Sequence, residues 1–296
     1  LTQQSYSITE TVEIIDNGST IIDADNTFQL TLNNVAVTLN LTNIEFRNSP
    51  SSGLIRTNRG TVNIANSTFD GGHTAVFIAN GDVLTVNNST FTNLSRGIAN
   101  DWGNTPTQYT SNDSDYQNRA YVSNSTFTNN GTAIYAERSV FVSNSTFSNN
   151  GTAINARGIN KHSVADSTFA NNTVAIRTFS SIPTDWTTFF NNTSLESNNR
   201  LFSGNDFQTN EYAFILDDGF NNGERTQQGS SVYNNTWDEA GAWVTWTQWD
   251  SETETNVTTN ETVLDGNIYS YYSSNNTSTK KELYAPTSVS AVVNED

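Results

Sequence analysis

The chain has 296 residues, no Cys, no Met and a formal net charge of −17 at pH 7. The lack of cysteine excludes disulfides, and the acidic balance disfavours nucleic acid and anionic membranes, because phosphate binding relies on clustered Lys and Arg. No stretch approaches the roughly 18 to 20 apolar residues that a membrane span requires. Because the chain opens at Leu1 rather than Met, we expect a processed product that is extracellular or lies on the cell surface.

The sequence of residues 1–35 predicts strands that begin the fold and cap one end of its core. Four isoleucines recur within the segment from Ile8 to Phe28, namely Ile14, Ile15, Ile21 and Ile22. Asp23 and Asp25 follow directly, and their carboxylate oxygens are the ligand type that Ca²⁺ prefers. A surface turn is the simpler interpretation of this acidic pair.

One phrase recurs between Val62 and Ile176: a short valine-rich run, then Asn-Ser-Thr-Phe, then Asn and Gly, then Ala-Ile. The four full quartets begin at Asn66, Asn88, Asn124 and Asn144, and a degenerate copy begins at Asp166. Their phenylalanines lie about 20 to 23 residues apart, except across residues 100–119, and such a period is the signature of a solenoid. Each repeat then contacts only its neighbours and shares a continuous core with them.

The segment Ala120–Glu137 illustrates one coil. Three short strands are predicted, over residues 121–122, 125–128 and 133–135, with Phe127 pointing inward. Asn129-Asn130-Gly131 forms a turn, because Asn and Gly tolerate positive φ. Three strands per turn predict an all-β fold, a right-handed parallel β-helix of about 9–10 coils over residues 36–244. Phe127 should then lie directly over Phe147, with Asn ladders at the corners.

The regularity weakens toward the C-terminus. The sequence predicts a loop insertion over residues 100–119. It also predicts a looser coil from Trp186 to Leu195 and the last coil from Val232 to Trp243. Past Thr245 the repeat dissolves, and we expect residues 245–296 to form an atypical Trp- and Tyr-rich C-terminal cap with a tail strand from Leu283 to Val293. That strand has no repeat partner, so it either folds back on its own chain or adds to a neighbouring subunit.

The Ile21-Ile22-Asp23-Ala24-Asp25 opening, the Val-x-Asn-Ser-Thr-Phe coils and the Asn-Asn-Gly corners resemble the parallel β-helix repeats of the pectate-lyase-like superfamily. That superfamily includes pectate lyases, polygalacturonases, phage tailspikes and archaeal or bacterial surface proteins. The resemblance covers roughly residues 10 to 245 and is closest to the carbohydrate-binding, NosD-type repeat surface proteins. It implies a fold strongly and an activity hardly at all, because one fold hosts many chemistries.

Enzymatic and metal chemistry find little support. A polysaccharide hydrolase needs paired carboxylates, but Asp217-Asp218 lies far along the chain from Gly72-His73, and we expect this acidic pair to occupy a solvated turn. Asp113 and Asp115 are weak calcium candidates within the loop insertion, so a structural Ca²⁺ is possible and no other cofactor is expected. Two separated histidines, His73 and His162, make a copper site a poor fit.

Asn-x-Ser/Thr sequons are the most frequent motif, and several arise simply because the repeat needs Asn at a corner and Ser-Thr before Phe. A sequon at an inward-facing ladder position cannot carry a glycan. The candidates for N-glycosylation are Asn66, Asn88, Asn93, Asn112, Asn171, Asn191, Asn234, Asn256, Asn260 and Asn275.

Three tryptophans, Trp243, Trp246 and Trp249, are candidates for carbohydrate contact, because amphipathic rings pair an apolar face with a polar tip. The alternative, which we favour, is that they cap the open end of the helix and hide its last backbone edge.

The sequence therefore predicts a non-enzymatic structural or adhesive surface glycoprotein. Its expected partners are copies of itself, as a filament or array joined by end stacking or tail-strand exchange, and surface glycans. The alternative is a carbohydrate-active enzyme, a lyase or hydrolase, or a viral tailspike that acts beside the loop insertion. An enzyme must bring two carboxylates within about 5 to 10 Å in one cleft.

Overall fold

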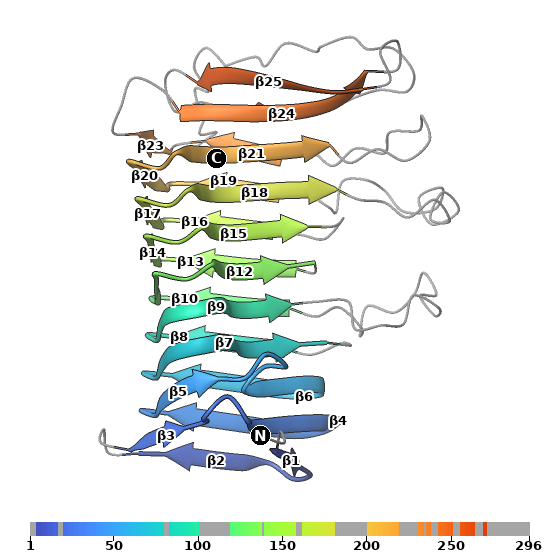
Figure 1. Ribbon diagram of the computed structural model, residues 1–296, viewed down its shortest axis with the longest axis vertical. Helices are drawn as coiled ribbons and strands as arrows, with labels where there is room; N and C mark the ends of the chain where they lie inside the picture. The colour runs from blue at the N-terminus through green and yellow to red at the C-terminus, as the bar shows by residue number, and fades with distance from the viewer. Residues whose placement is uncertain are drawn as a thin grey trace, which may run out of the picture.

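The computed structural model describes residues 4–16, 20–79, 83–100, 119–137, 139–157, 162–180, 200–218, 230–233, 235–237, 242–250, 255–263 and 269–270. Their regular structure is all strand, and the strands wind into a parallel β-solenoid (Figure 1). The predicted all-β solenoid class is therefore confirmed.

Each turn of the solenoid contributes to three faces. The first face stacks β2 (Val12–Ile15), the C-terminal halves of β4 (Phe28–Thr42) and β6 (Ile55–Ala65), β8 (Val83–Asn87), β10 (Arg119–Ser123), β13 (Ser139–Ser143), β16 (His162–Ala165), β19 (Arg200–Ser203) and β22 (Ser230–Tyr233). The second face stacks β3 (Ile21–Asp23), β5 (Glu45–Ser49), the N-terminal halves of β7 (Thr68–Ile78) and β9 (Thr90–Asn100), β11 (Thr126–Thr128), β14 (Thr146–Ser148), β17 (Thr168–Ala170), β20 (Asp206–Gln208) and β23 (Thr236–Trp237).

The third face begins at β1 (Gln4–Ile8) and continues through the N-terminal halves of β4 and β6 and the C-terminal halves of β7 and β9. It then stacks β12 (Thr132–Ala136), β15 (Thr152–Arg157), β18 (Val174–Ser180), β21 (Tyr212–Asp218) and β24 (Ala242–Asp250). Two further strands, β25 (Thr255–Val263) and β26 (Tyr269–Ser270), pair antiparallel with β24 and β22. The parallel ladder therefore gives way to antiparallel pairing at β25 and β26.

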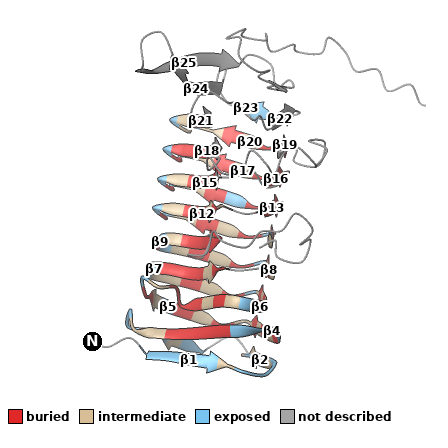
Figure 2. Ribbon diagram, turned by 90° about the vertical axis from the view of Figure 1, so that its right-hand side faces the viewer, coloured by how far each residue is buried: buried red, intermediate tan, exposed pale blue. Residues whose placement is uncertain are grey.

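The predicted rung-over-rung register is confirmed. Phe127 pairs with Phe91 on one side and Phe147 on the other, and the three rings stack with centroids 4.8 and 4.9 Å apart. The same column extends from Phe46 to Phe207, and Trp237 pairs with Phe207 beyond it. The interior of the solenoid is thus a continuous stack of buried rings and aliphatic side chains, and the ribbon segments that carry them are coloured as buried in Figure 2.

Each residue of the Asn-Ser-Thr-Phe phrase has its own structural role. The Asn adopts positive φ at the corner, for example 51° at Asn124, which Asn accepts more readily than most residues. The Ser is buried and accepts a bond from the previous rung, as Ser145 Oγ does from Ser125 N at 3.2 Å. The Thr faces outward and the Phe faces inward, because side chains alternate along a strand.

A second ladder runs inside the opposite corner of the second face. Asn150 is buried, and its Oδ1 accepts from the backbone N and the Nδ2 of Asn130 at 2.9 and 3.0 Å. Its own Nδ2 donates to Phe127 O at 3.1 Å and to Asn172 Oδ1 at 2.9 Å. These amides satisfy the buried backbone groups at each corner, which would otherwise destabilise the coil.

The coil predicted from Trp186 to Leu195 lies outside the described residues, and the described strands β16, β17 and β18 pair directly with β19, β20 and β21. One detail differs from expectation. Residues 1–35 contribute strands in the same parallel ladders as later coils, so β1 to β3 form a first rung below β4 and β5. The loop insertion lies outside the described residues between Asn100 and Arg119.

Candidate functional site

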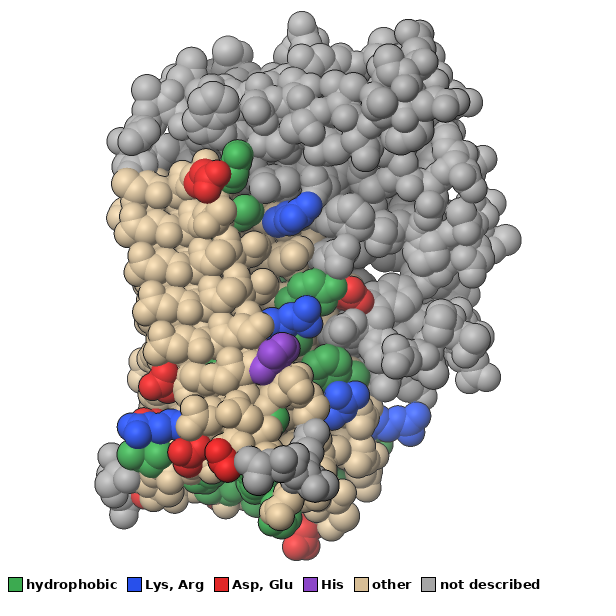
Figure 3. Space-filling view, in the orientation of Figure 1, with side chains coloured by type: hydrophobic (Ala, Val, Ile, Leu, Met, Phe, Trp, Pro, Cys, Tyr) green, Lys and Arg blue, Asp and Glu red, His purple; other side chains and the backbone are tan. Residues whose placement is uncertain are grey.

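One strip on the third face differs in character from the surface around it. Most outward positions in the described coils carry Thr, Ser or Asn, whereas the strip brings together arginine, histidine and aromatic side chains (Figure 3). Its members, which we call the third-face strip, are Arg56, His73, Phe77, Arg96, Tyr135 and Arg177.

The ladder register explains why these residues meet. One outward column runs in register through Arg56, Phe77, Ala99, Tyr135 and Asn155, and continues to Arg177 on the next rung. A neighbouring column places Arg96 beside Thr74 and Thr132. Because rungs are about 4.8 Å apart, residues separated by 20 or more positions in sequence become near neighbours.

Two arginines lie over aromatic rings. The Cζ of Arg56 is 4.5 Å from the ring centroid of Phe77, and the Cζ of Arg96 is 4.9 Å from that of Tyr135. A cation over an aromatic ring is attracted to the ring face, and its N–H groups can still donate to other partners. Each pair is partly exposed, so part of an aromatic ring and several hydrogen-bond donors lie side by side at the surface.

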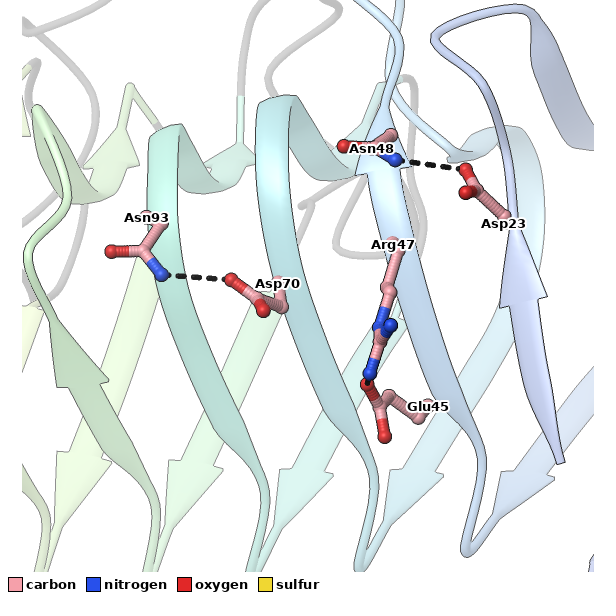
Figure 4. Close-up of polar contacts among 6 residues, drawn as sticks. All are labelled: Asp23, Glu45, Arg47, Asn48, Asp70 and Asn93. Atoms are coloured by element: carbon pink, nitrogen blue, oxygen red, sulfur yellow. Dashed lines mark hydrogen bonds and ion pairs between the residues drawn. The ribbon is translucent and has the colours of Figure 1, made fainter. Parts of the chain in front are cut away.

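Hydrogen bonds to neighbouring polar groups fix the orientation of side chains in the strip. Tyr135 Oη donates to Glu137 Oε1 at 2.6 Å, which fixes the phenol, and His73 Nδ1 lies 2.9 Å from Thr74 Oγ1. On the second face, by contrast, Arg47 forms an ion pair with Glu45 at 2.6 Å (Figure 4). The strip thus combines cations and rings where the second face balances its cation with an acid.

Four of the glycosylation candidates are exposed at the surface of the described coils. Asn66, Asn88, Asn93 and Asn171 are exposed and have positive φ at the corners of the second face. Asn88 Nδ2 donates to Asn66 Oδ1 at 2.7 Å, and Asn93 Nδ2 donates to Asp70 Oδ1 at 2.8 Å (Figure 4).

The structure describes some of the remaining glycosylation candidates and the strand that carries the three tryptophans. Asn256 and Asn260 lie on β25, opposite Trp249 and Thr245 of β24, and Trp243 and Trp246 lie on the same β24. All three tryptophans therefore belong to the last hairpin, and their contact with carbohydrate stays a prediction. Four candidates lie outside the described residues: Asn112, Asn191, Asn234 and Asn275.

The metal and catalytic candidates are not brought together. Asp113 and Asp115 lie outside the described residues, and no group of three His, Cys, Asp or Glu side chains that could hold a metal occurs within the described ranges. Asp23 Oδ1 accepts from Asp25 N and from Asn48 Nδ2, both at 2.9 Å, so that oxygen is already occupied. Asp217-Asp218 ends strand β21 instead of occupying the predicted turn.

The third-face strip was not identified from the sequence. A signal was present, because outward positions that usually carry Thr or Asn hold Phe77, Arg96 and Tyr135 instead. Recognising it requires the register of the third face, which the irregular spacing of the coils obscures.

No protein-family model, curated protein or solved structure matches this chain. The parallel solenoid agrees with the resemblance noted above at the level of fold. Among the residues that the structure describes, no helix is long and apolar enough to cross a membrane. The functional argument therefore depends on the geometry of the strip.

Proposed function

We propose that this chain is a non-enzymatic surface protein of the extracellular space, built on the NosD-type branch of the pectate-lyase-like superfamily, which adheres to glycans. The observation that carries the proposal is the third-face strip, with its two arginine–aromatic pairs. The outward Thr, Ser and Asn of the remaining coils provide a soluble and regular scaffold.

The strip suits a sugar for a physical reason. A pyranose ring presents C–H groups on its faces and hydroxyl groups around its rim. The parts of the Phe77 and Tyr135 rings that the stacked arginines leave exposed offer apolar surface for the first, and the guanidinium groups of Arg56 and Arg96 offer several donors for the second. A parallel solenoid holds these groups on rigid strands, so little side-chain freedom is lost on binding.

Adhesion is favoured over hydrolysis by the carboxylates near the strip. Glycoside hydrolysis requires two carboxyl groups that flank one bond. The carboxylate of Glu137 lies beside the strip, and it accepts a hydrogen bond from Tyr135 that holds the phenol in place. We therefore expect glycans incubated with the protein to keep their chain length, which is checked by size analysis of the products.

Replacing Tyr135 with alanine is expected to weaken glycan binding about 5- to 10-fold. The substitution removes the ring and also the surface against which Arg96 stacks. Arg96→Ala should have a similar effect. Binding is measured by isothermal titration with ligands selected on a glycan array, using the full chain.

Tyr121→Ala is the matched control, because Tyr121 is an exposed tyrosine on the first face that stacks on the ring of Phe141 and not under an arginine. Its affinity should equal that of the unmodified chain. Equal losses of glycan affinity in Tyr121→Ala and Tyr135→Ala would contradict the strip as the glycan-binding surface. Loss in Trp246→Ala alone would instead move the sugar site to the last hairpin, and shortened glycans would favour the enzyme alternative.

The glycoprotein part of the proposal has its own test. Asn130-Gly131-Thr132 and Asn150-Gly151-Thr152 are sequons, but both asparagines are buried. Each uses its Nδ2 within the ladder, so an attached sugar would remove those hydrogen bonds. Glycopeptide mass spectrometry of native material should find sugar at Asn66, Asn88, Asn93 or Asn171 and none at these two positions. An attached sugar at Asn130 or Asn150 would contradict the burial of these two side chains in the hydrogen-bonded asparagine ladder.

A further inference from the structure

The N-terminal end of the solenoid is open among the described residues. β1 and β2 pair with β4, and β3 pairs with β5, each on one side (Figure 1). No described strand lies on the other side of this first rung. Its backbone N–H and C=O groups on that side are therefore available to pair with an added strand.

The first rung also exposes apolar surface. Tyr6 is 51%, Ile15 59% and Ile21 48% exposed, and β1 is mostly exposed along its length (Figure 2). The inward residues of this rung are only partly buried, whereas their counterparts one rung above, such as Leu39 and Phe46, are fully buried. Those partly buried residues are Ile8, Val12, Ile14 and Ile22. An added strand would cover them.

The first rung is strongly acidic. The sequence contains no Lys, Arg or His before Arg47. Within that stretch the acids of the first rung and its corners are Glu10, Glu13, Asp16, Asp23 and Asp25. The side chain of Asn48 and the backbone N–H of Asp25 donate to Asp23 and lower its pKa below the usual range, so this carboxylate stays charged in mild acid (Figure 4).

One segment of this chain has the complementary character. Residues Thr287–Val293 alternate, with Val289, Ala291 and Val293 at every second position. Lys280 and Lys281, two of the three lysines in the chain, lie just before this segment. Pro286 lacks an N–H group and so marks the start of any strand that pairs fully.

We propose that Thr287–Val293 of a second copy adds as a strand beneath β2, with Lys280 and Lys281 directed toward Glu10 and Glu13. The alternating apolar residues would cover the partly buried Val12 and Ile14. This inference goes beyond glycan adhesion and uses none of the residues of the third-face strip.

The length of the connecting chain favours a second copy over the same chain. From β22, where β26 pairs, the first-face ladder descends through β19, β16, β13, β10, β8, β6 and β4 to β2. With the rung added beneath β2, this distance is about 43 Å at about 4.8 Å per rung. Residues 271–286 number 16, and a random-coil chain of that length has a typical span of about 22 Å. Reaching its own first rung would therefore require stretching to about twice that length.

The geometry of such a contact sets the form of the assembly. The acceptor is at one end of the solenoid, and β24 and β25 are at the other (Figure 1). Strand β26 pairs with β22, which belongs to the last rung of the first face. A contact between two different surfaces that does not close on itself propagates. Copies would therefore join head to tail in a linear chain.

A direct test uses a fluorescent synthetic peptide of residues 279–293 and full-length protein carrying Val289→Pro, which removes strand pairing by its own tail. Fluorescence anisotropy should show saturable binding that weakens with added salt, because the lysines face carboxylates. The full chain without substitutions should sediment as species that grow with concentration, and Val289→Pro should remain a monomer.

Charge reversal makes the register testable. Glu10→Lys with Glu13→Lys should lower peptide affinity at least about tenfold, and Lys280→Glu with Lys281→Glu in the peptide should do the same. Combining the two reversals should restore binding. Glu211→Lys, at an exposed acid near the other end, should leave affinity unchanged. Circular dichroism confirms that each protein variant keeps its strands.

Absence of saturable peptide binding, or absence of rescue in the combined reversal, overturns the proposal. Peptide binding together with a monomer at every concentration overturns the second copy as the occupant. Neither result bears on glycan binding, which is measured with different variants.

Discussion

Asn150→Ala is expected to destabilise the solenoid by at least about 3 kcal/mol. The substitution removes the acceptor for the backbone N and the Nδ2 of Asn130 and the donor for Phe127 O. All three groups are at a buried corner, and each buried group left without a partner costs about 1 to 3 kcal/mol. Urea denaturation followed by circular dichroism measures the change in the free energy of unfolding.

The neighbouring residue provides the matched control. Asn149 is exposed and has φ of 56°, which glycine adopts freely. Asn149→Gly should change the free energy of unfolding by less than about 1 kcal/mol. If Asn150→Ala unfolds at the same urea concentration as Asn149→Gly, the buried amide ladder does not stabilise the coil as described.

Phe127→Ala is expected to destabilise the solenoid by about 3 to 5 kcal/mol, the usual range for removing a buried phenylalanine. Its ring is fully buried between Phe91 and Phe147, with centroids 4.8 and 4.9 Å away and interplanar angles of 6° and 7°. Neighbouring rungs cannot collapse onto the cavity, because their strands are held in register by the backbone ladder.

The damage should be local to the neighbouring rungs. A solenoid is stabilised by contacts between adjacent repeats, so amide exchange should rise most in β9, β11 and β14 and least near β3. Phe141→Ala is the control, because Phe141 is a half-buried residue that points outward on the first face. Equal losses of stability in the two variants would contradict the central role of the ring stack.

The sequence by itself determined the fold class, and the reason is periodicity. Each Phe of the Asn-Ser-Thr-Phe phrase recurs about one turn later, so the stacking of Phe127 on Phe147 follows from spacing alone. The role of Asn at corners follows in the same way, because few other residues tolerate positive φ. Irregular segments carry no such period, and the looser coil predicted from Trp186 to Leu195 lies outside the described residues.

Only the tertiary structure decided which outward residues share a surface. Arg56 and Phe77 are 21 positions apart, and Arg96 and Tyr135 are 39 apart, with residues 101–118 between them. Insertions of different length change the separation along the chain but not the rung on which a residue lies. The open, acidic first rung is a property of the same kind, because an unpaired edge exists only once the other strands have found their partners. Inward positions repeat because packing requires it, whereas outward positions are free to vary, and their arrangement becomes visible only when the rungs are stacked.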